Sequence, residues 1–141
     1  MGKTLILLVE DDDTEAELMH LALLKNGVAA DVIRAKDGAE ALDILLSSNG
    51  NGNPQPSVVF LDLNLPKVNG MEVLQVIRSK DGLRMVPVVM LSSSARAEDI
   101  QSAYMLGANS YVRKATNFDE FCGVVKQLTS YWLGLNEPAP L

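Results

Sequence analysis

The sequence predicts an α/β fold: a doubly wound, five-stranded parallel sheet within a single domain. Short apolar segments rich in β-branched residues alternate five times with segments of helical periodicity, which is typical of a parallel sheet with helices on both faces. The apolar runs that reach Val9, Leu61 and Leu91 are uninterrupted, as expected for strands buried on both faces. The chain has 141 residues, a length that fits one domain with one core.

Five strands are predicted from apolar runs that turn-forming residues interrupt. The first, third and fourth contain the longest apolar runs, as expected of strands buried on both faces. The second and fifth contain shorter apolar runs. In chain order the predicted strands are residues 4–9, 30–35, 57–62, 87–91 and 110–113.

A helix is predicted after each strand. The helices begin near residues 13, 37, 70, 97 and 117, and the last one ends at about residue 133. Asp13 or Thr14 is the expected N-cap of the first helix, and Thr14 with Glu17 has the spacing of a capping box. Residues 47–56, rich in asparagine, glycine and proline, are predicted to form a flexible loop.

Composition excludes several classes of protein. The net charge of −6 argues against a nucleic-acid partner, because proteins that bind phosphate backbones usually carry a basic stripe. No run approaches the roughly 18 apolar residues of a membrane span, and no signal peptide is evident, so we expect a cytoplasmic protein. Cys122 is expected in the core rather than as a reactive thiol, and the single histidine, His20, at the surface.

Four consecutive acids, residues 10–13, follow the first strand. Helix capping and the helix dipole would account for one or two of these carboxylates. The remaining carboxylates would repel one another at the end of a buried strand. The excess indicates a bound cation.

Functional groups follow four different strands: Glu10 and Asp11, Asp62, Ser92, and Lys114. The carboxyl ends of parallel strands meet at one edge of the sheet, so these groups can converge. Oxygen ligands without cysteine or histidine favour Mg²⁺. A hard cation beside one ammonium and one hydroxyl suits a phosphoryl group. Taken alone, Asp62 could simply open the turn before Pro66, and Ser92 to Ser94 could cap the next helix.

The chain resembles the receiver domains of two-component response regulators over residues 3–130. Four motifs carry the resemblance, in the family's order and spacing: Leu7 to Asp12, Leu61 to Pro66, Val89 to Ser93, and Tyr111 to Lys114. The resemblance implies the flavodoxin-like strand order 2-1-3-4-5. It also implies a signalling module that catalyses only its own Mg²⁺-dependent phosphotransfer and dephosphorylation.

The resemblance assigns a role to each site residue. Asp62 would be the phosphorylated nucleophile, with Asp11, Asp62 and the backbone carbonyl of Asn64 as Mg²⁺ ligands and Glu10 holding metal-bound water. Ser92 would hydrogen-bond the phosphoryl group and Lys114 would pair with it. Tyr111 would be the aromatic side chain that moves with Ser92.

Two features depart from the family pattern. Ala115 follows Lys114 where the family usually has a proline in a cis bond. No output domain is expected after the receiver domain, residues 1–135, only a short tail, residues 136–141. These features and the loop lengths make the chain resemble the small single-domain receivers paired with phytochrome-type histidine kinases, so we expect a histidine kinase partner of the bacteriophytochrome type.

Two other functions are considered. A haloacid-dehalogenase-type phosphatase also uses an aspartate nucleophile and Mg²⁺, but that family places its nucleophile on the first strand with a second aspartate two residues later. Here the third strand carries Asp62, and position 64 is asparagine. A flavin or nucleotide binder would need a phosphate-cradling loop after the first strand, where four acids would repel a phosphate.

The end of the last helix predicts an assembly. Its apolar residues extend beyond the length that a receiver core needs: Leu128, Tyr131, Trp132, Leu133 and Leu135. Such surfaces often mark a partner, and soluble homo-oligomers are most often two-fold dimers. We therefore expect a homodimer through residues of about 118–135. The alternative is that Trp132 and Leu133 fold back onto the protein itself.

Overall fold

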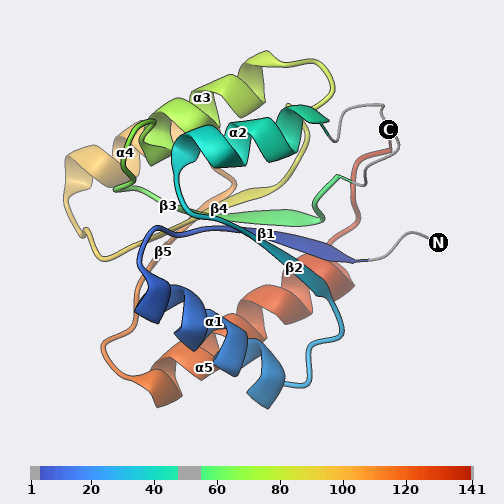
Figure 1. The fold of residues 1–141 in the computed structure, drawn as a ribbon, viewed down its shortest axis with the longest axis vertical. Coiled ribbons are helices and arrows are strands. Elements are labelled where there is room, and N and C mark those ends of the chain that lie inside the picture. The colour runs from blue at the N-terminus through green and yellow to red at the C-terminus, as the bar shows by residue number, and fades with distance from the viewer. Residues whose placement is uncertain (1–3, 48–54, 141) are drawn as a thin grey trace.

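The computed structural model describes residues 4–47 and 55–140. Its centre is a five-stranded parallel sheet in the order β2-β1-β3-β4-β5, with helices on both faces (Figure 1). The predicted fold class and strand order are confirmed. Most of the predicted loop, residues 48–54, lies outside the described residues.

The strands and helices alternate along the chain as predicted. The strands are β1 (Leu5–Val9), β2 (Asp31–Ala35), β3 (Val58–Asp62), β4 (Val88–Ser92) and β5 (Ser110–Arg113). The helices are α1 (Asp13–Lys25), α2 (Gly38–Ser47), α3 (Gly70–Ser79), α4 (Ala97–Met105) and α5 (Phe118–Ser130). After α5 the backbone continues as η1, a π-helical turn over Tyr131–Leu135, so the regular α-helix is shorter than predicted. No helix among these residues is long and apolar enough to cross a membrane.

The sheet separates two apolar cores. Helices α2, α3 and α4 cover one face and α1 and α5 the other (Figure 1). Side chains of the central strands alternate between the cores, because successive residues of a strand point to opposite faces. In β3, for example, Val59 and Leu61 enter the first core and Val58 and Phe60 the second. This double burial explains why the central strands are uninterrupted apolar runs.

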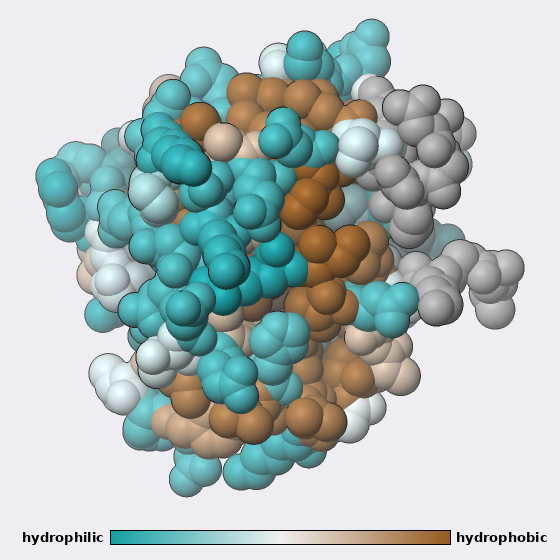
Figure 2. All heavy atoms as spheres, viewed as in Figure 1, coloured by the Kyte–Doolittle hydropathy of each residue, from teal (hydrophilic) through white to brown (hydrophobic). Residues whose placement is uncertain are grey.

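Strand β2 forms an edge of the sheet and is less buried. Ile33 is 40% exposed, and exposed leucines lie on the flanking helices, Leu24 in α1 and Leu46 in α2. In the view of Figure 2, hydrophobic residues gather along this side of the molecule, while hydrophilic residues cover much of the rest. Cys122 is buried, as predicted, and His20 is exposed.

The start of α1 differs from the prediction. Asp12 is the N-cap, and its side chain accepts a hydrogen bond from the Glu15 backbone N–H at 3.0 Å. The predicted caps, Asp13 or Thr14 with Glu17, were therefore wrong. Aspartate caps a helix as well as threonine does, and the extended backbone of Asp12 already suits an N-cap.

Candidate functional site

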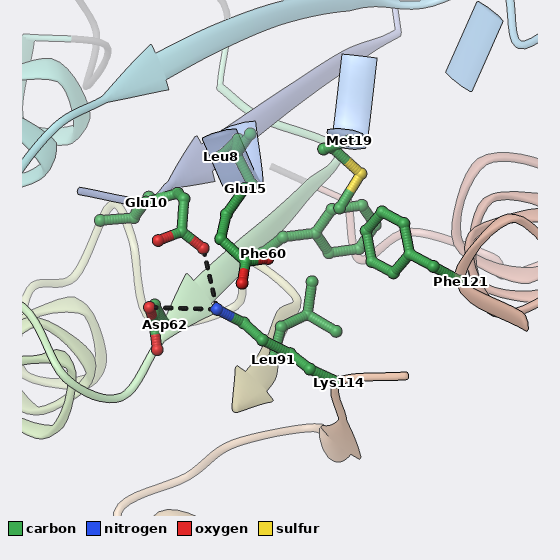
Figure 3. Close-up of a pocket in the computed structure, with 10 residues that line it drawn as sticks. Leu8, Glu10, Glu15, Met19, Phe60, Asp62, Leu91, Lys114 and Phe121 are labelled. Atoms are coloured by element: carbon green, nitrogen blue, oxygen red, sulfur yellow. Dashed lines mark hydrogen bonds and ion pairs between the residues drawn. The ribbon is translucent and has the colours of Figure 1, made fainter. Parts of the chain in front are cut away.

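The groups at the ends of β1, β3 and β5 meet at the carboxyl edge of the sheet. Carboxylate oxygens of Glu10, Asp11 and Asp62 lie within 4.8 Å of one another. The Lys114 ammonium donates to Glu10 Oε1 at 3.0 Å and to Asp62 Oδ2 at 3.3 Å (Figure 3). Residues 10, 11, 62 and 114, predicted to converge, are thus brought together.

Parallel pairing fixes the backbone at both sides of this cluster. The hydrogen-bond ladder runs one residue beyond the strands, because the Glu10 N–H donates to the Ala35 carbonyl at 3.0 Å. At the other side the Lys114 N–H donates to the Ser92 carbonyl at 2.9 Å. The site residues therefore sit on a rigid frame, which suits a preorganised reaction site.

A cavity beside the site is lined mainly by apolar side chains, with the Glu15 carboxylate among them. Phe60, Met19 and Phe121 lie to one side of the Glu10–Lys114 pair (Figure 3). The cavity there has a volume of about 10 Å³, room for roughly one water molecule. This side of the charged groups therefore has room for little water.

This environment changes the acidity of two groups. Burial raises the pKa of Glu10 from 4.5 to about 7, even though the nearby Lys114 ammonium opposes the shift. Burial acts to lower the pKa of Lys114, but its hydrogen bond to Glu10 and the charge of Asp62 outweigh burial, so the pKa is raised. The ammonium stays charged and holds the carboxylates together.

The four consecutive acids have separate tasks. Asp12 caps α1, and Asp13 pairs with Arg34 at 2.8 Å. Glu10 and Asp11 remain for the cluster with Asp62. Capping thus accounts for only one of the four acids, in agreement with the predicted excess.

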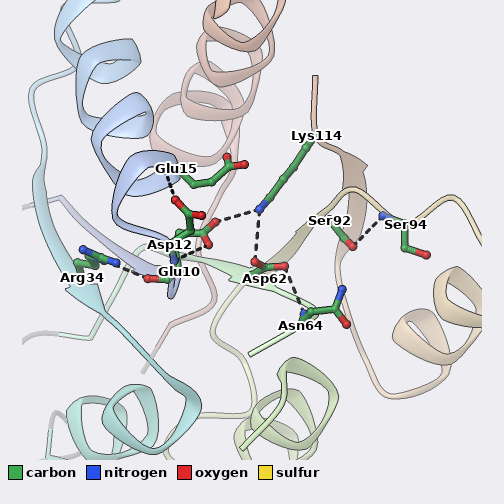
Figure 4. A network of polar contacts seen from close by, with 9 residues as sticks. All are labelled: Glu10, Asp12, Glu15, Arg34, Asp62, Asn64, Ser92, Ser94 and Lys114. Atoms are coloured by element: carbon green, nitrogen blue, oxygen red, sulfur yellow. Dashed lines mark hydrogen bonds and ion pairs between the residues drawn. The ribbon is translucent and has the colours of Figure 1, made fainter. Parts of the chain in front are cut away.

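Ser92 and Asn64 lie beside the cluster (Figure 4). Ser92 ends β4 and is fully buried, and its hydroxyl accepts a hydrogen bond from the Ser94 N–H at 3.1 Å. The Asn64 N–H donates to Asp62 Oδ1 at 3.3 Å. Helix α4 has Arg96 as its N-cap, without a side-chain capping bond, so the alternative that the serines cap this helix is wrong.

Tyr111 is tied to the loop that follows Ser92. Its hydroxyl donates to the Ser94 carbonyl at 3.0 Å, and its backbone N–H donates to the Tyr104 hydroxyl of α4 at 3.2 Å. The Ser94 hydroxyl in turn donates to Asp99 in the first turn of α4 at 2.6 Å. The predicted switch residues therefore belong to one hydrogen-bonded group that reaches α4.

Two contributors escaped the sequence analysis. A Cβ on Gly70 would lie 2.2 Å from the Asp62 carbonyl, so this glycine allows α3 to approach the strand end. Arg34 holds the loop that carries Glu10. A lone glycine at a helix start and an arginine within a strand are weak signals.

The Lys114–Ala115 bond is trans, since the described residues contain no cis peptide bond.

The donor set fits a divalent cation. Three carboxylates offer hard oxygen ligands from one side, and no described histidine or cysteine joins the cluster.

The family model of the response regulator receiver domain matches residues 6–126. The chain belongs to this family. It is therefore a phosphoryl-accepting signalling protein, as the four motifs predicted.

Among curated proteins, the chain is 40% identical over 137 residues to the "Probable methanogenesis regulatory protein FilR2" of Methanothrix harundinacea (strain 6Ac), covering 96% of this chain and 88% of that protein. It is 35% identical over 129 residues to the response regulator Rcp1 of Synechocystis sp., covering 91% and 88%.

Solved structures of response regulators share the fold, among them a phytochrome response regulator and a bacteriophytochrome response regulator. The phosphorylated cyanobacterial regulator RcpA superposes with a TM-score of 0.89 at 35% identity, over 99% of this chain and 100% of that one. The Mn²⁺-bound form of Rcp1 gives a TM-score of 0.87 at 32% identity, over 99% and 100%. The bacteriophytochrome response regulator AtBRR gives 0.76 at 44% identity, over 97% and 100%.

Proposed function

We propose that Asp62 accepts the phosphoryl group from a phosphohistidine of a kinase. The observation that carries the proposal is the position of its carboxylate, at the end of β3, against Lys114 and beside Glu10 and Asp11. An Asp62 oxygen would form the new bond to phosphorus while the bond from phosphorus to the histidine nitrogen breaks. Removal of this phosphoryl group would be the only other reaction that the chain catalyses.

Mg²⁺ is the proposed cation. Asp11 and Asp62 would bind it through carboxylate oxygens and Asn64 through its backbone carbonyl, while Glu10 would hold metal-bound water. The bound cation would neutralise the charge of the phosphoryl oxygens, which the carboxylates would otherwise repel. The Mn²⁺-bound structure of Rcp1 supports a divalent ion in this family.

The proposed switch consists of Ser92, Lys114 and Tyr111. Ser92 would donate its hydroxyl to the phosphoryl group and Lys114 would pair with the new charge. Since Ser92 and Tyr111 both bond to Ser94, movement of Ser92 would disturb the Tyr111–Ser94 bond. The signal would then pass to α4 through Ser94 and Asp99.

A histidine kinase is the proposed partner, because receiver domains interact with such kinases. A phytochrome-type kinase is favoured, since RcpA is a phytochrome response regulator and AtBRR is a bacteriophytochrome response regulator. The chain is also similar to FilR2, whose name does not refer to a phytochrome. A test should therefore compare a phytochrome-type kinase with a histidine kinase that responds to a different kind of signal.

A phosphotransfer assay tests this function. Purified protein is mixed with autophosphorylated kinases of both classes, in Mg²⁺ and in excess chelator. We expect rapid labelling from a phytochrome-type kinase in Mg²⁺ and background labelling in chelator, because unscreened carboxylates repel the phosphoryl donor. Equal labelling with and without chelator would contradict the metal-dependent mechanism.

We also propose a homodimer through residues of about 118–135. Leu128, Trp132 and Leu133 are partly buried against the second core, beside α1, so the monomer itself covers part of their apolar surface. This was the alternative raised for Trp132 and Leu133. Tyr131 and Leu135, 46% and 80% exposed, remain available to a second copy.

Two exposed side chains make the dimer testable. We expect Tyr131→Glu with Leu135→Glu to convert a dimer into a monomer in light scattering, because charges are costly to bury in an interface. The matched control, Met105→Glu, changes an 82% exposed residue on α4. A wild-type protein that is monomeric with and without a phosphoryl mimic would rule the dimer out.

A further inference from the structure

Arg34 connects the edge strand β2 to the acidic loop after β1. Its Nε donates to the Glu10 backbone carbonyl at 3.0 Å (Figure 4), and its Nη1 donates to Asp13 Oδ1 at 2.8 Å. Only 18% of its side chain is exposed. One guanidinium therefore holds the two residues that stand on either side of Asp11 and Asp12.

The bond to the Glu10 carbonyl completes the anchoring of that residue. The Glu10 N–H bonds to Ala35, and its carboxylate accepts from Lys114 and from the Asp12 N–H. The carbonyl that Arg34 holds belongs to the peptide plane that leads into Asp11. Fixing this plane restricts the direction in which the Asp11 side chain leaves the backbone.

The bond to Asp13 keeps a competing carboxylate away. Asp13 is the first residue of α1 and its side chain is 86% exposed. Without a partner it could turn towards a cation held by the neighbouring acids. Paired with Arg34, it lies on the β2 side of the loop, outside the Glu10, Asp11 and Asp62 cluster.

Stability alone does not explain this arrangement. An ion pair with an exposed carboxylate contributes little to stability. A cation beside the first turn of α1 also faces the positive end of the helix dipole. In addition, Nη2 of Arg34 is buried and has no hydrogen-bond partner among the described residues, which is unfavourable.

We propose that Arg34 is a positioning residue for the cation site: it holds the Glu10 carbonyl and the Asp13 carboxylate so that Asp11 is directed towards Asp62. The inference rests on the proposed function, because it requires that Glu10, Asp11 and Asp62 bind a cation. Arg34 acts through the loop and does not touch the cation itself.

The sign of a change in metal affinity separates this role from simple electrostatics. The positive charge of Arg34 repels a cation, so removing the charge alone would tighten binding. Removing a positioning contact would weaken it, as loss of an outer-shell partner typically does. Lys36 gives the matched control, because it is exposed and its charge also acts on Asp13, but it makes no bond to Glu10 among those observed.

The test measures Mn²⁺ binding to the unphosphorylated protein by electron paramagnetic resonance. We expect Arg34→Met to weaken binding on the order of tenfold. Arg34→Lys should weaken it less, because one ammonium can replace one of the two bonds. Lys36→Met should bind as tightly as the wild type or more tightly. Binding by Arg34→Met that equals or exceeds that of the wild type would overturn the proposal.

Circular dichroism in chelator shows whether Arg34→Met is folded. If it is unfolded, Arg34→Lys alone decides: weaker binding supports the role of Arg34, and wild-type affinity overturns it. A wild-type protein that binds no Mn²⁺ would overturn both this inference and the proposed cation site. If the wild type binds Mn²⁺ and Arg34→Met binds it equally tightly, this inference alone is overturned.

Discussion

Asp62→Asn is expected to lose all phosphoryl labelling and to keep its fold. Asparagine is nearly isosteric with aspartate but lacks the anionic oxygen that would attack phosphorus. The substitution leaves Lys114 paired with Glu10 and removes one of the crowded carboxylates. We therefore expect the free energy of unfolding to change by no more than about 1 kcal/mol.

The measurement is labelling by an autophosphorylated histidine kinase in Mg²⁺, alongside thermal unfolding. Asp119→Asn is the matched control, because its side chain is 91% exposed and lies on α5. It should be labelled at the wild-type rate. Stable labelling of Asp62→Asn at the wild-type level would show that another residue accepts the phosphoryl group.

The sequence was sufficient to predict where the site would form. Burial on both faces of β1, β3 and β4 leaves uninterrupted apolar runs, so each strand end is visible as the first polar residue. Parallel pairing then requires these ends to share one edge. The convergence of Glu10 and Asp62 follows from these two facts, without knowledge of any side-chain conformation. Strand β5 is only half-buried and contains Ser110 and Arg113, so its end at Lys114 is less evident from the sequence.

Contacts between neighbouring strands were not predictable in the same way. Arg34 lies opposite Leu8 in the sheet, and its importance depends on which backbone carbonyl its side chain reaches. The cap of α1 was missed because several adjacent acids could have served as the N-cap. At Gly70, nothing in the sequence shows that a Cβ would meet the Asp62 carbonyl.

The end of α5 shows a different limit. Periodicity identified Trp132 and Leu133 as apolar residues on the last helix, but not whether they face a partner or the protein itself. The change from α-helical to π-helical hydrogen bonding over Tyr131–Leu135 alters which side chains face the core. Local sequence patterns give no sign of this change.

Lys114→Ala is expected to destabilise the metal-free protein strongly, in a pH-dependent manner. The substitution leaves the buried carboxylates of Glu10 and Asp62 without their cation. Loss of one partner of a buried ion pair typically lowers the free energy of unfolding by on the order of 3 kcal/mol. The control Lys25→Ala breaks an exposed pair with Asp119 and should lower it by less than about 1 kcal/mol.

The pH dependence follows from Glu10. Its folded pKa, about 7, lies above its ordinary value of 4.5, so folding is penalised increasingly as the pH rises through this window. Without Lys114, whose charge lowers the pKa of Glu10, the penalty grows. We therefore expect the loss in free energy of unfolding caused by Lys114→Ala to be large at about pH 8 and smaller at about pH 5, where Glu10 is protonated in the folded protein.

Urea unfolding in chelator at the two pH values measures this loss. Mg²⁺ should restore part of the lost stability, because a bound cation replaces the missing charge. A loss that is equal at both pH values would show that Lys114 contributes through packing rather than through its charge.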